Sequence, residues 1–434
     1  MGEEREMPVH DERCLVTVCG SIPKRNLGDG KVLVLESVFR DRREQAVPTT
    51  PESHLSLATQ RSACDFPCTI ADNLLLESKM HFMTEVEELK LLGCSTMLVE
   101  VEYGDTSALQ RLKQLAEEAK LTIAVSLALT SRSRVFEAEK PVQSPQLFAL
   151  ELLRAMTKPD HGIPAASIGE ISTTAENGKE LQKVELLLRA ALAARASLSC
   201  PIFVEFPVFE EARSLVFGIL NGVEGEVNNI VFTQAERALR PSYSIEQHMK
   251  RGFSFLFSPL RSASPFSLAH TASRQTVILS ELVSTTLRLE REYPGQVMWS
   301  SVVRHKCDQK AFGGPGYGAA FGPLLTYFGD EGNEDTEMIR TRLTHDNALS
   351  PLCWYSPPKE EKKAIPKWEC DNCGKRVSTT KDPFRKFDGK FCSMKCLRQF
   401  VEQNKPQSSA PSTEGFHKKG GSGASDLARW DVVA

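Results

Sequence analysis

Two pairs of closely spaced cysteines near the carboxyl end of this 434-residue chain constrain its fold more than any other feature. Two residues separate Cys370 from Cys373, and three separate Cys392 from Cys396. Thiolates at these spacings can share one tetrahedral zinc ion, because a tight turn brings their sulfur atoms together. Gly374 follows the first pair, where a residue free to adopt positive φ relieves the turn. The spacing therefore predicts one structural zinc ion held by these four cysteines.

The segment around the cysteines is too short to fold by burying apolar side chains alone. The side chains that can close over the ion are Phe384, Phe387, Phe391 and Phe400. Zinc binding supplies the folding free energy that so small a core lacks. Residues 370–400 resemble the FCS-type zinc finger, which is named for the triplet found here at 391–393. That finger type occurs in chromatin proteins, where it is associated with RNA binding, and a similar cysteine pattern in plants serves as a protein adaptor.

The finger segment is basic, although the whole chain has a formal net charge of −3. Residues 367–405 contain ten lysines or arginines against five acidic residues. A basic face suits phosphate groups, but a solvated surface has the same composition. The candidates for contacts to nucleic acid or to another partner are Lys375, Arg376, Arg385, Lys386, Lys390, Lys395 and Arg398.

The composition is that of an ordinary globular protein, with 41% hydrophobic and 25% charged residues. No run of apolar residues is long enough to span a membrane, and the amino-terminal residues lack the apolar region of a signal peptide. We therefore expect a protein of the cytosol or the nucleus, without a membrane partner. In either compartment the eight cysteines outside the finger should be reduced thiols.

The body of the chain alternates short apolar runs with amphipathic segments. Strands are predicted at residues 96–101, 122–129, 201–206, 229–233 and 253–257. Helices are predicted at residues 107–120, 181–197, 210–221 and 245–250. Repeated strand and helix units of this spacing indicate a parallel sheet, and their number favours a closed (β/α)8 TIM-type barrel.

The composition also suggests where the domains end. We assign residues 10–356 to the barrel, 357–367 to a charged, proline-bounded linker, 368–402 to the finger and 403–434 to a tail. The tail is rich in Ser, Gly, Lys and Pro, which cannot form a core, and we expect it to be disordered. Trp430 lies in an apolar island within it, which is either a docking motif or an idle terminus.

Parts of the body resemble the phosphotriesterase-related branch of the amidohydrolase superfamily. The resemblance rests on residues 98–100, 112–118, 168–171, 200–201 and 312–317, whose order and spacing match over residues 20–354. Members of that branch are (β/α)8 barrels with a two-metal centre that activates a hydroxide for hydrolysis. The resemblance thus implies both a fold and a set of ligand positions at the strand ends.

This chain has lost most of those ligands. At the six ligand positions of the family it carries Leu35, Ser37, Glu170, Glu205, Gln234 and Val302. Glu170, in a Gly-Glu-Ile segment, matches the bridging carboxylate of the family and is the one ligand retained. Glu205 and Gln234 stand where the family has histidines, and Val302 stands where it has an aspartate. Leucine, serine, glutamine and valine cannot hold a transition metal there, so the hydrolytic chemistry of the family should be absent.

Three functions are compatible with this pattern. The first and preferred one is an interaction protein, a pseudoenzyme whose barrel is a scaffold and whose finger binds a protein partner. The second is a hydrolase with a remodelled site around Glu170 and Glu205, aided by Arg304 or His305. The third is an RNA- or DNA-binding protein led by the basic finger. For Glu170 the simplest expectation is a barrel-mouth residue held by hydrogen bonds.

Overall fold

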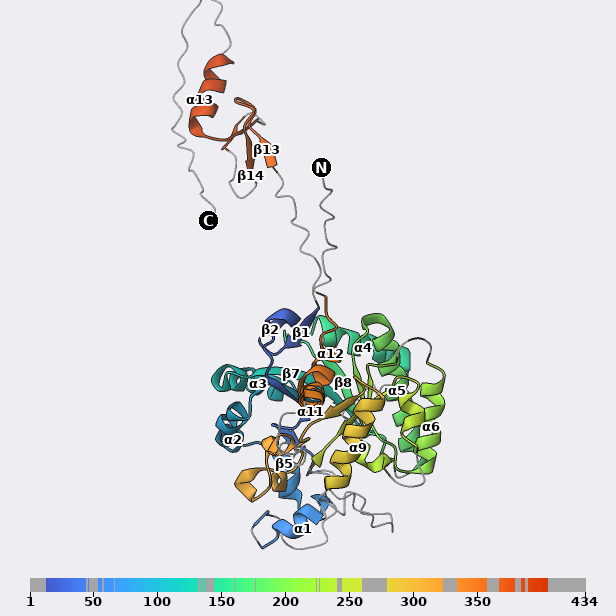
Figure 1. The fold of residues 1–434 in the computed structure, drawn as a ribbon. Coiled ribbons are helices and arrows are strands. Elements are labelled where there is room, and N and C mark those ends of the chain that lie inside the picture. The colour runs from blue at the N-terminus through green and yellow to red at the C-terminus, as the bar shows by residue number, and fades with distance from the viewer. Residues whose placement is uncertain are drawn as a thin grey trace, which may run out of the picture. The chain divides into compact units, whose positions relative to one another are not determined.

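The structure is a computed structural model in which the chain divides into two compact units, Met1–Pro357 and Pro358–Ala434. We call them the barrel unit and the finger unit, and Figure 1 shows both. The described residues are 13–43, 46, 54–56, 58–65, 67–131, 133, 136, 144–159, 161–175, 177–223, 225, 227–239, 244–259, 279–322, 334–356, 367–378, 384–386 and 389–404.

The barrel unit is built on an eight-stranded parallel sheet, in which the hydrogen-bonded order is β12-β11-β10-β9-β8-β7-β6-β3. The strands are β3 (Lys31–Glu36), β6 (Cys94–Glu102), β7 (Thr122–Leu129), β8 (Ser167–Ile171), β9 (Ile202–Glu205), β10 (Ile230–Thr233), β11 (Ser254–Phe257) and β12 (Val297–Trp299). Their side chains are almost all buried, as expected for strands enclosed by helices on one face and by a barrel interior on the other.

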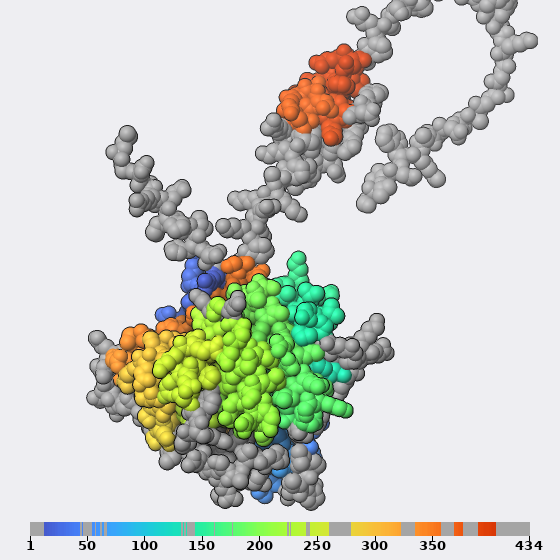
Figure 2. All heavy atoms as spheres, turned by 90° about the vertical axis from the view of Figure 1, so that its right-hand side faces the viewer, coloured from blue at the N-terminus to red at the C-terminus, as the bar shows by residue number. Residues whose placement is uncertain are grey.

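Helices surround the sheet (Figure 1). They are α2 (Lys79–Leu91), α3 (Thr106–Ala119), α4 (Pro145–Thr157), α5 (Gly178–Leu198), α6 (Glu210–Asn221), α7 (Glu246–Met249), α9 (Leu279–Glu292) and α11 (Glu334–Thr341). Figure 2 shows one side of this wall, where α4, α5, α6 and α9 lie next to one another in colours from teal through green to orange. These helices separate the sheet from solvent on that side.

Helix α3 illustrates why these segments fold as they do. Leu109, Leu112 and Leu115 recur at helical spacing and are all buried. Asp105 caps the first turn, because its carboxylate accepts a hydrogen bond of 3.0 Å from the backbone N–H of Ala108. The helix ends at Lys120, which adopts a left-handed conformation with φ of 52°.

The barrel interior is filled by apolar side chains, and the end at which the strands begin is covered. Val34, Phe203 and Leu256 belong to the buried cluster inside the barrel. The hairpin of β1 (Cys14–Thr17) and β2 (Gly20–Pro23) covers the amino-terminal ends of the strands, where Val18 N–H donates to Ile123 O at 2.9 Å. Helix α12 (Asn347–Leu352) covers the same end through Asn347, whose amide donates to Val297 O at 2.7 Å. The opposite, carboxyl-terminal end is left for the loops that could form a site.

The barrel is nearly closed, and the carboxylate of Glu36 bridges the remaining seam between β3 and β12. Ser300 Oγ accepts from Val34 N–H at 2.7 Å and donates to Glu36 Oε1 at 2.8 Å. The backbone N–H groups of Val302 and Val303 donate to the two oxygens of Glu36, at 2.8 and 2.6 Å. Ser37 N–H also donates to Val303 O at 2.9 Å, so the buried Glu36 side chain adds to backbone pairing among the described residues of this seam.

Glu36→Ala should weaken the barrel by about 2 to 3 kcal/mol, because it leaves buried N–H and O–H donors without an acceptor. The measurement is the free energy of unfolding in urea. Ser284→Ala, on the exposed face of α9, serves as the control and should have little effect. A cost below about 0.5 kcal/mol, the range of ordinary surface substitutions, would show that the seam does not depend on this carboxylate.

Glu36 should also make the barrel less stable as the pH rises. Burial raises the pKa of Glu36 from 4.5 to about 7, and its hydrogen bonds offset only part of that effect. Between these two values the folded state binds a proton that the unfolded chain has released, so the stability conferred by the protonated form is lost as pH rises. Unfolding free energies measured between about pH 5 and pH 8 should decline less steeply for Glu36→Gln. Equal slopes for both proteins would contradict the assignment.

The described residues of the finger unit form two short antiparallel hairpins and one helix. The first hairpin pairs β13 (Lys367–Glu369) with β14 (Arg376–Ser378), and the second pairs β15 (Phe384–Lys386) with β16 (Gly389–Phe391). Helix α13 (Met394–Gln403) follows, and Ser393 caps it by accepting a hydrogen bond of 3.2 Å from Cys396 N–H. Each element is short, as expected for a fold organised around an ion.

The main sequence-based predictions of fold are confirmed. Each predicted strand and helix of the body overlaps an observed element, and the sheet is a nearly closed parallel barrel followed by a small cysteine-rich unit. Residues 357–366 of the predicted linker and residues 405–434 of the predicted tail, with Trp430, lie outside the described residues. None of the described helices combines the length and the apolar character needed to cross a membrane.

Candidate functional site

Besides Glu36 at the end of β3, the carboxyl-terminal ends of the strands bring three more buried glutamates to one end of the barrel, which we call the barrel mouth. Glu100 lies on β6, Glu170 on β8 and Glu205 on β9. Their residue exposures are only 3%, 4% and 6%. Buried carboxylates are costly unless they are paired, so their partners determine what this site can do.

Glu170 forms an ion pair with Arg304 at the centre of the mouth. The two guanidinium nitrogens Nη1 and Nη2 donate to Glu170 Oε2 and Oε1, each at 2.5 Å. Thr233 Oγ1 also donates to Glu170, and Gln234 Nε2 lies 3.4 Å from its Oε2. Burial alone would raise the pKa of Glu170, but the charge and hydrogen bonds of Arg304 outweigh it and lower the pKa to about 2. Glu170 is therefore ionised, and both of its carboxylate oxygens already accept hydrogen bonds.

Glu205 has its own arginine and further donors from the segments that follow the neighbouring strands β8 and β10. Arg237 Nη1 donates to its Oε1 at 2.8 Å, and Ser172 Oγ and Thr173 N–H donate to its Oε2 at 2.7 and 3.0 Å. Gln234 Nε2, 3.3 Å from Glu205 Oε1, links this carboxylate to Glu170. The two glutamates named from the sequence are therefore brought together, but each is neutralised by its own arginine.

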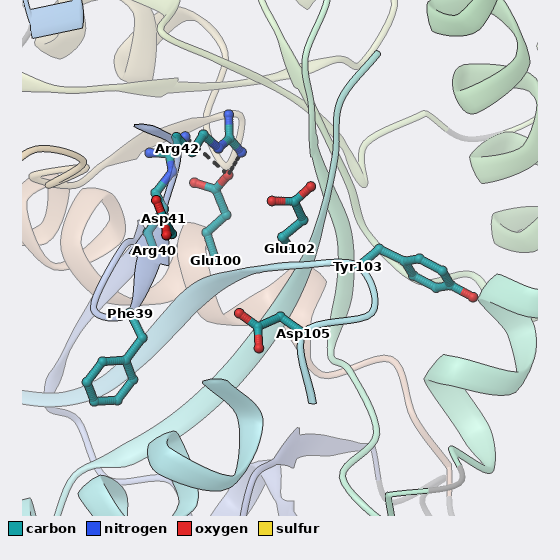
Figure 3. Close-up of a pocket in the computed structure, with 8 residues that line it drawn as sticks. All are labelled: Phe39, Arg40, Asp41, Arg42, Glu100, Glu102, Tyr103 and Asp105. Carbon is teal, nitrogen blue, oxygen red and sulfur yellow. Dashed lines mark hydrogen bonds and ion pairs between the residues drawn. The ribbon is translucent and has the colours of Figure 1, made fainter. Parts of the chain in front are cut away.

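Glu100 completes the network on the β3 side (Figure 3). Arg42 Nη2 donates to Glu100 Oε1 at 3.0 Å, and Arg40 Nη2 lies 3.8 Å from the same oxygen. Burial, reinforced by the charge of Arg42, lowers the pKa of Arg40 to about 9. The pocket in this figure is lined by Arg40, Arg42, Glu100 and Glu102 among others, and has a volume of about 40 Å³. That space suits a few water molecules and is far below the volume of an ordinary ligand site.

The residues at the other ligand positions do not form a metal site. Leu35 and Val302 pack within the apolar cluster that fills the barrel, and Ser37 Oγ lies 3.4 Å from a Glu100 oxygen. A two-metal centre needs several imidazole and carboxylate donors, whereas the mouth offers carboxylates already bound by guanidinium groups. The donor set therefore does not fit the metal pair of the resembled family.

The backbone at three of these positions has an unusual conformation. Leu35, Gln234 and Val302 have φ angles of 59°, 55° and 55°. Residues that carry a Cβ atom rarely adopt this left-handed backbone conformation, and a β-branched residue such as valine adopts it least of all. The remaining described non-glycine residues with positive φ, Lys120 and Ser199, end helices. Strained backbone of this kind concentrates at functional sites, and here it coincides with ligand positions of the family.

The four cysteines of the finger unit do form a metal-binding group. The four sulfur atoms of this group all lie within 4.8 Å of one another; the residues are Cys370, Cys373, Cys392 and Cys396. The Cys392 sulfur is 3.6 Å from that of Cys373 and 3.5 Å from that of Cys396. Tetrahedral zinc with Zn–S bonds of about 2.3 Å requires sulfur separations of about 3.8 Å. The donor set and its spacing fit a zinc ion.

The local backbone positions these thiols as the sequence suggested. Gly374 has φ of 68°, and its N–H donates to Cys370 O at 2.9 Å, which closes the first turn. Cys392 N–H donates to the Cys370 sulfur at 3.3 Å. Phe391 and Phe400 pack in the small cluster with the cysteines, whereas the side chains of Phe384 and Phe387 lie outside the described residues.

The basic candidates of the finger are only partly placed. Lys375, Lys390, Lys395 and Arg398 are exposed. The side chains of Arg376, Arg385 and Lys386 lie outside the described residues. Met394, at the start of α13, is also 46% exposed, which the sequence reasoning did not single out.

Sequence reasoning also missed most of the mouth network. It named Glu170, Glu205 and Gln234, and it offered Arg304 as a neighbour, but it did not assign Arg40, Arg42, Arg237 or the role of Glu36. A usable signal was present: Arg40 and Arg42 closely follow a strand whose end should reach the mouth.

One family model matches the chain, and it covers the finger. Residues 367–408 match the Vms1-associating treble clef domain. The match contains all four cysteines and the 391–393 triplet, so the predicted zinc-binding module is a treble clef domain. No curated protein sequence matches the chain significantly.

Solved structures similar to this chain share its barrel fold. A resiniferatoxin-binding protein from Rhodobacter sphaeroides has a TM-score of 0.64 at 19% identity, over 78% of this chain and 94% of its own. The lactonase Lmo2620 from Listeria monocytogenes has a TM-score of 0.57 at 17% sequence identity, and the match covers 80% of this chain and 100% of the lactonase. A phosphotriesterase homology protein from Escherichia coli, complexed with phosphate in its active site, has a TM-score of 0.51 at 16% sequence identity. The match covers 75% of this chain and 99% of that protein. The predicted phosphotriesterase-like barrel fold is therefore confirmed.

Proposed function

We propose that this protein is a catalytically inactive, phosphotriesterase-like scaffold whose treble clef domain binds a protein partner. One observation carries the first half of this proposal: the Arg304 guanidinium binds both oxygens of Glu170, each at 2.5 Å. The one carboxylate retained from the family's ligands is thus committed to a fixed cation within the protein. A metal ion would have to displace a buried charge that the same carboxylate stabilises.

The mouth is also poorly suited to a remodelled hydrolase. A general base works best with a pKa near the working pH, and Arg304 lowers the pKa of Glu170 to about 2. Glu205 accepts from Arg237, Ser172 and Thr173, so its lone pairs are engaged as well. The neighbouring pocket lined by described residues, of about 40 Å³, is too small for an ordinary substrate. These features support the scaffold over the remodelled enzyme.

Two features support a protein partner over nucleic acid for the finger. The matching family is named for association with Vms1, which is a protein association. The exposed Met394 lies one turn from Leu397, which is only partly buried, so α13 offers an apolar contact between basic residues. Flexible apolar side chains of this kind are common at protein-binding surfaces.

Binding of the full chain to a purified Vms1-type protein tests this half of the proposal. Met394→Asp should weaken binding about tenfold or more, because it places a charge in an apolar contact. The matched control is Lys395→Glu at the adjacent exposed position, which should change the affinity much less. A reversed order of effects would contradict the assignment. So would tight binding of single-stranded RNA by the unmodified chain with a steep salt dependence.

A further inference from the structure

The thiols of Cys64 and Cys307 lie together beside the loop that follows Arg304. Cys64 is on the short helix α1 (Gln60–Asp65), and Cys307 is on the 3-10 turn η7 (Lys306–Asp308). Cys307 belongs to a small buried cluster with Ala63 and Ile70, and Cys64 packs against that cluster. The Cys307 sulfur is 3.7 Å from Ala63 O, the carbonyl next to Cys64.

Other contacts hold the Cys307 turn in place without any covalent bond, through the neighbouring 3-10 turn η4 (Ala71–Leu74). Cys307 N–H donates to Asn73 Oδ1 at 2.9 Å, and Lys306 Nζ lies 2.5 Å from Asp72 Oδ1. A disulfide needs two Cβ atoms held close in a suitable orientation, and it stores strain when the backbone must move. Here the packing already places Cys64 against the cluster that holds Cys307, with the Cys307 sulfur beside the carbonyl of Ala63.

The two cysteines differ in their access to solvent. Cys307 is 2% exposed, and its hydrogen bond to Cys64, followed by burial, raises the pKa of its thiol. Cys64 is half-buried, so an oxidant in solution meets it first. Cys68 is exposed, but outside the finger the described residues contain no group of three metal-ligating side chains close enough to share an ion. The arrangement is therefore that of a two-thiol site with an outer and an inner member.

We propose that Cys64 and Cys307 form a reversible disulfide by exchange with a small-molecule disulfide such as oxidised glutathione. The Cys64 thiolate attacks one sulfur of the oxidant, forms a mixed disulfide and releases one thiolate, which takes up the proton that Cys64 lost. Cys307 then gives up its proton and attacks the Cys64 sulfur, which releases the second thiol. Two protein thiols are oxidised by two electrons, and one disulfide is reduced to two thiols.

The bond would link redox state to the segment that supports the barrel mouth. The backbone N–H groups of Arg304 and His305 both donate to the Asp308 carboxylate at 2.9 Å, so η7 and the Arg304 backbone form one hydrogen-bonded turn. Fastening Cys307 to α1 would fasten that turn as well.

Peptide mapping of the full chain, equilibrated in glutathione buffers of increasing oxidation and then alkylated, tests the proposal. A peptide linked through Cys64 and Cys307 should appear in the unmodified chain and in Cys68→Ser, and should be absent from Cys64→Ser. The oxidised chain should melt roughly 5 °C higher than the reduced chain, since the bond closes a long loop, and the shift should vanish in Cys64→Ser.

Two results would overturn the inference. One is a Cys64–Cys68 linkage in place of the Cys64–Cys307 linkage. The other is glutathione that stays attached to Cys64 in the unmodified chain as fully as in Cys307→Ala, which would show that Cys307 does not resolve the mixed disulfide. Cys64→Ser changes a half-buried residue and keeps the comparison informative if Cys307→Ala fails to fold.

Discussion

Arg304→Met should destabilise the barrel unit by about 3 to 5 kcal/mol, because it leaves the Glu170 carboxylate buried without its counter-charge. Arg304 is 7% exposed and Glu170 is 4% exposed, so solvent cannot replace the lost guanidinium without opening the mouth. The change appears as a lower midpoint in urea unfolding, followed by tryptophan fluorescence, to which the buried Trp299 of the barrel contributes.

A double variant distinguishes loss of the ion pair from loss of packing. In Glu170→Met with Arg304→Met no uncompensated charge remains, so most of the stability lost in Arg304→Met should return. Arg288→Met, which removes an exposed ion pair with Glu246, should cost less than about 1 kcal/mol. A double variant as unstable as Arg304→Met would contradict the account, because the cost would then not come from the unpaired carboxylate.

The same ion pair predicts acid sensitivity. The pKa of Glu170 is lowered from 4.5 to about 2 in the folded state, so its stabilisation is complete above 4.5 and is lost as the pH falls towards 2. The effect of Arg304→Met should therefore shrink in acid.

Cys392→Ser should abolish zinc-dependent folding of the finger and leave the barrel transition almost unchanged. Structural zinc sites contribute about 10 to 16 kcal/mol of binding free energy in finger peptides, which is their folding free energy. The small apolar cluster around Phe391 and Phe400 cannot supply that amount. The barrel should be unaffected, because the chain divides into two compact units and the substitution lies in the second.

Limited proteolysis, combined with thermal unfolding, measures both halves of this prediction. In Cys392→Ser the segment 367–404 should be cleaved rapidly, while a barrel fragment survives with its original melting temperature. Cys68→Ser removes an exposed thiol of the barrel unit and should leave both patterns intact. A finger that resists cleavage in Cys392→Ser would show that zinc does not hold it together.

Local patterns determined how much of this structure could be predicted from the sequence. The apolar run at residues 122–129 predicted β7 with the same bounds, because strand formation there follows from consecutive buried β-branched and aliphatic residues. The cysteine spacing predicted the metal-binding group for the same reason: each pair lies within one turn of chain. Both are properties of neighbouring residues.

The mouth network depends on contacts between distant residues and could not be predicted in the same way. Arg304 lies 134 residues from Glu170, and no local pattern distinguishes it from the other arginines. Glu36 likewise stands between two lost ligand positions, and its role across the seam follows from the left-handed backbone at Leu35 and Val302. Leu35 lies on β3 and Val302 follows β12, so both conformations occur at a seam between residues that are far apart in the sequence.

The metal content of the full chain and of Cys392→Ser shows whether the finger cysteines bind a metal ion and the barrel mouth does not. Each protein would be incubated with zinc and manganese, dialysed and analysed for bound metal. We predict one zinc ion per chain in the unmodified protein, bound by the four cysteines, and no stoichiometric metal in Cys392→Ser. Stoichiometric zinc or manganese retained by Cys392→Ser, and lost again when Glu170→Ala is added, would place a metal centre in the barrel mouth and contradict the account.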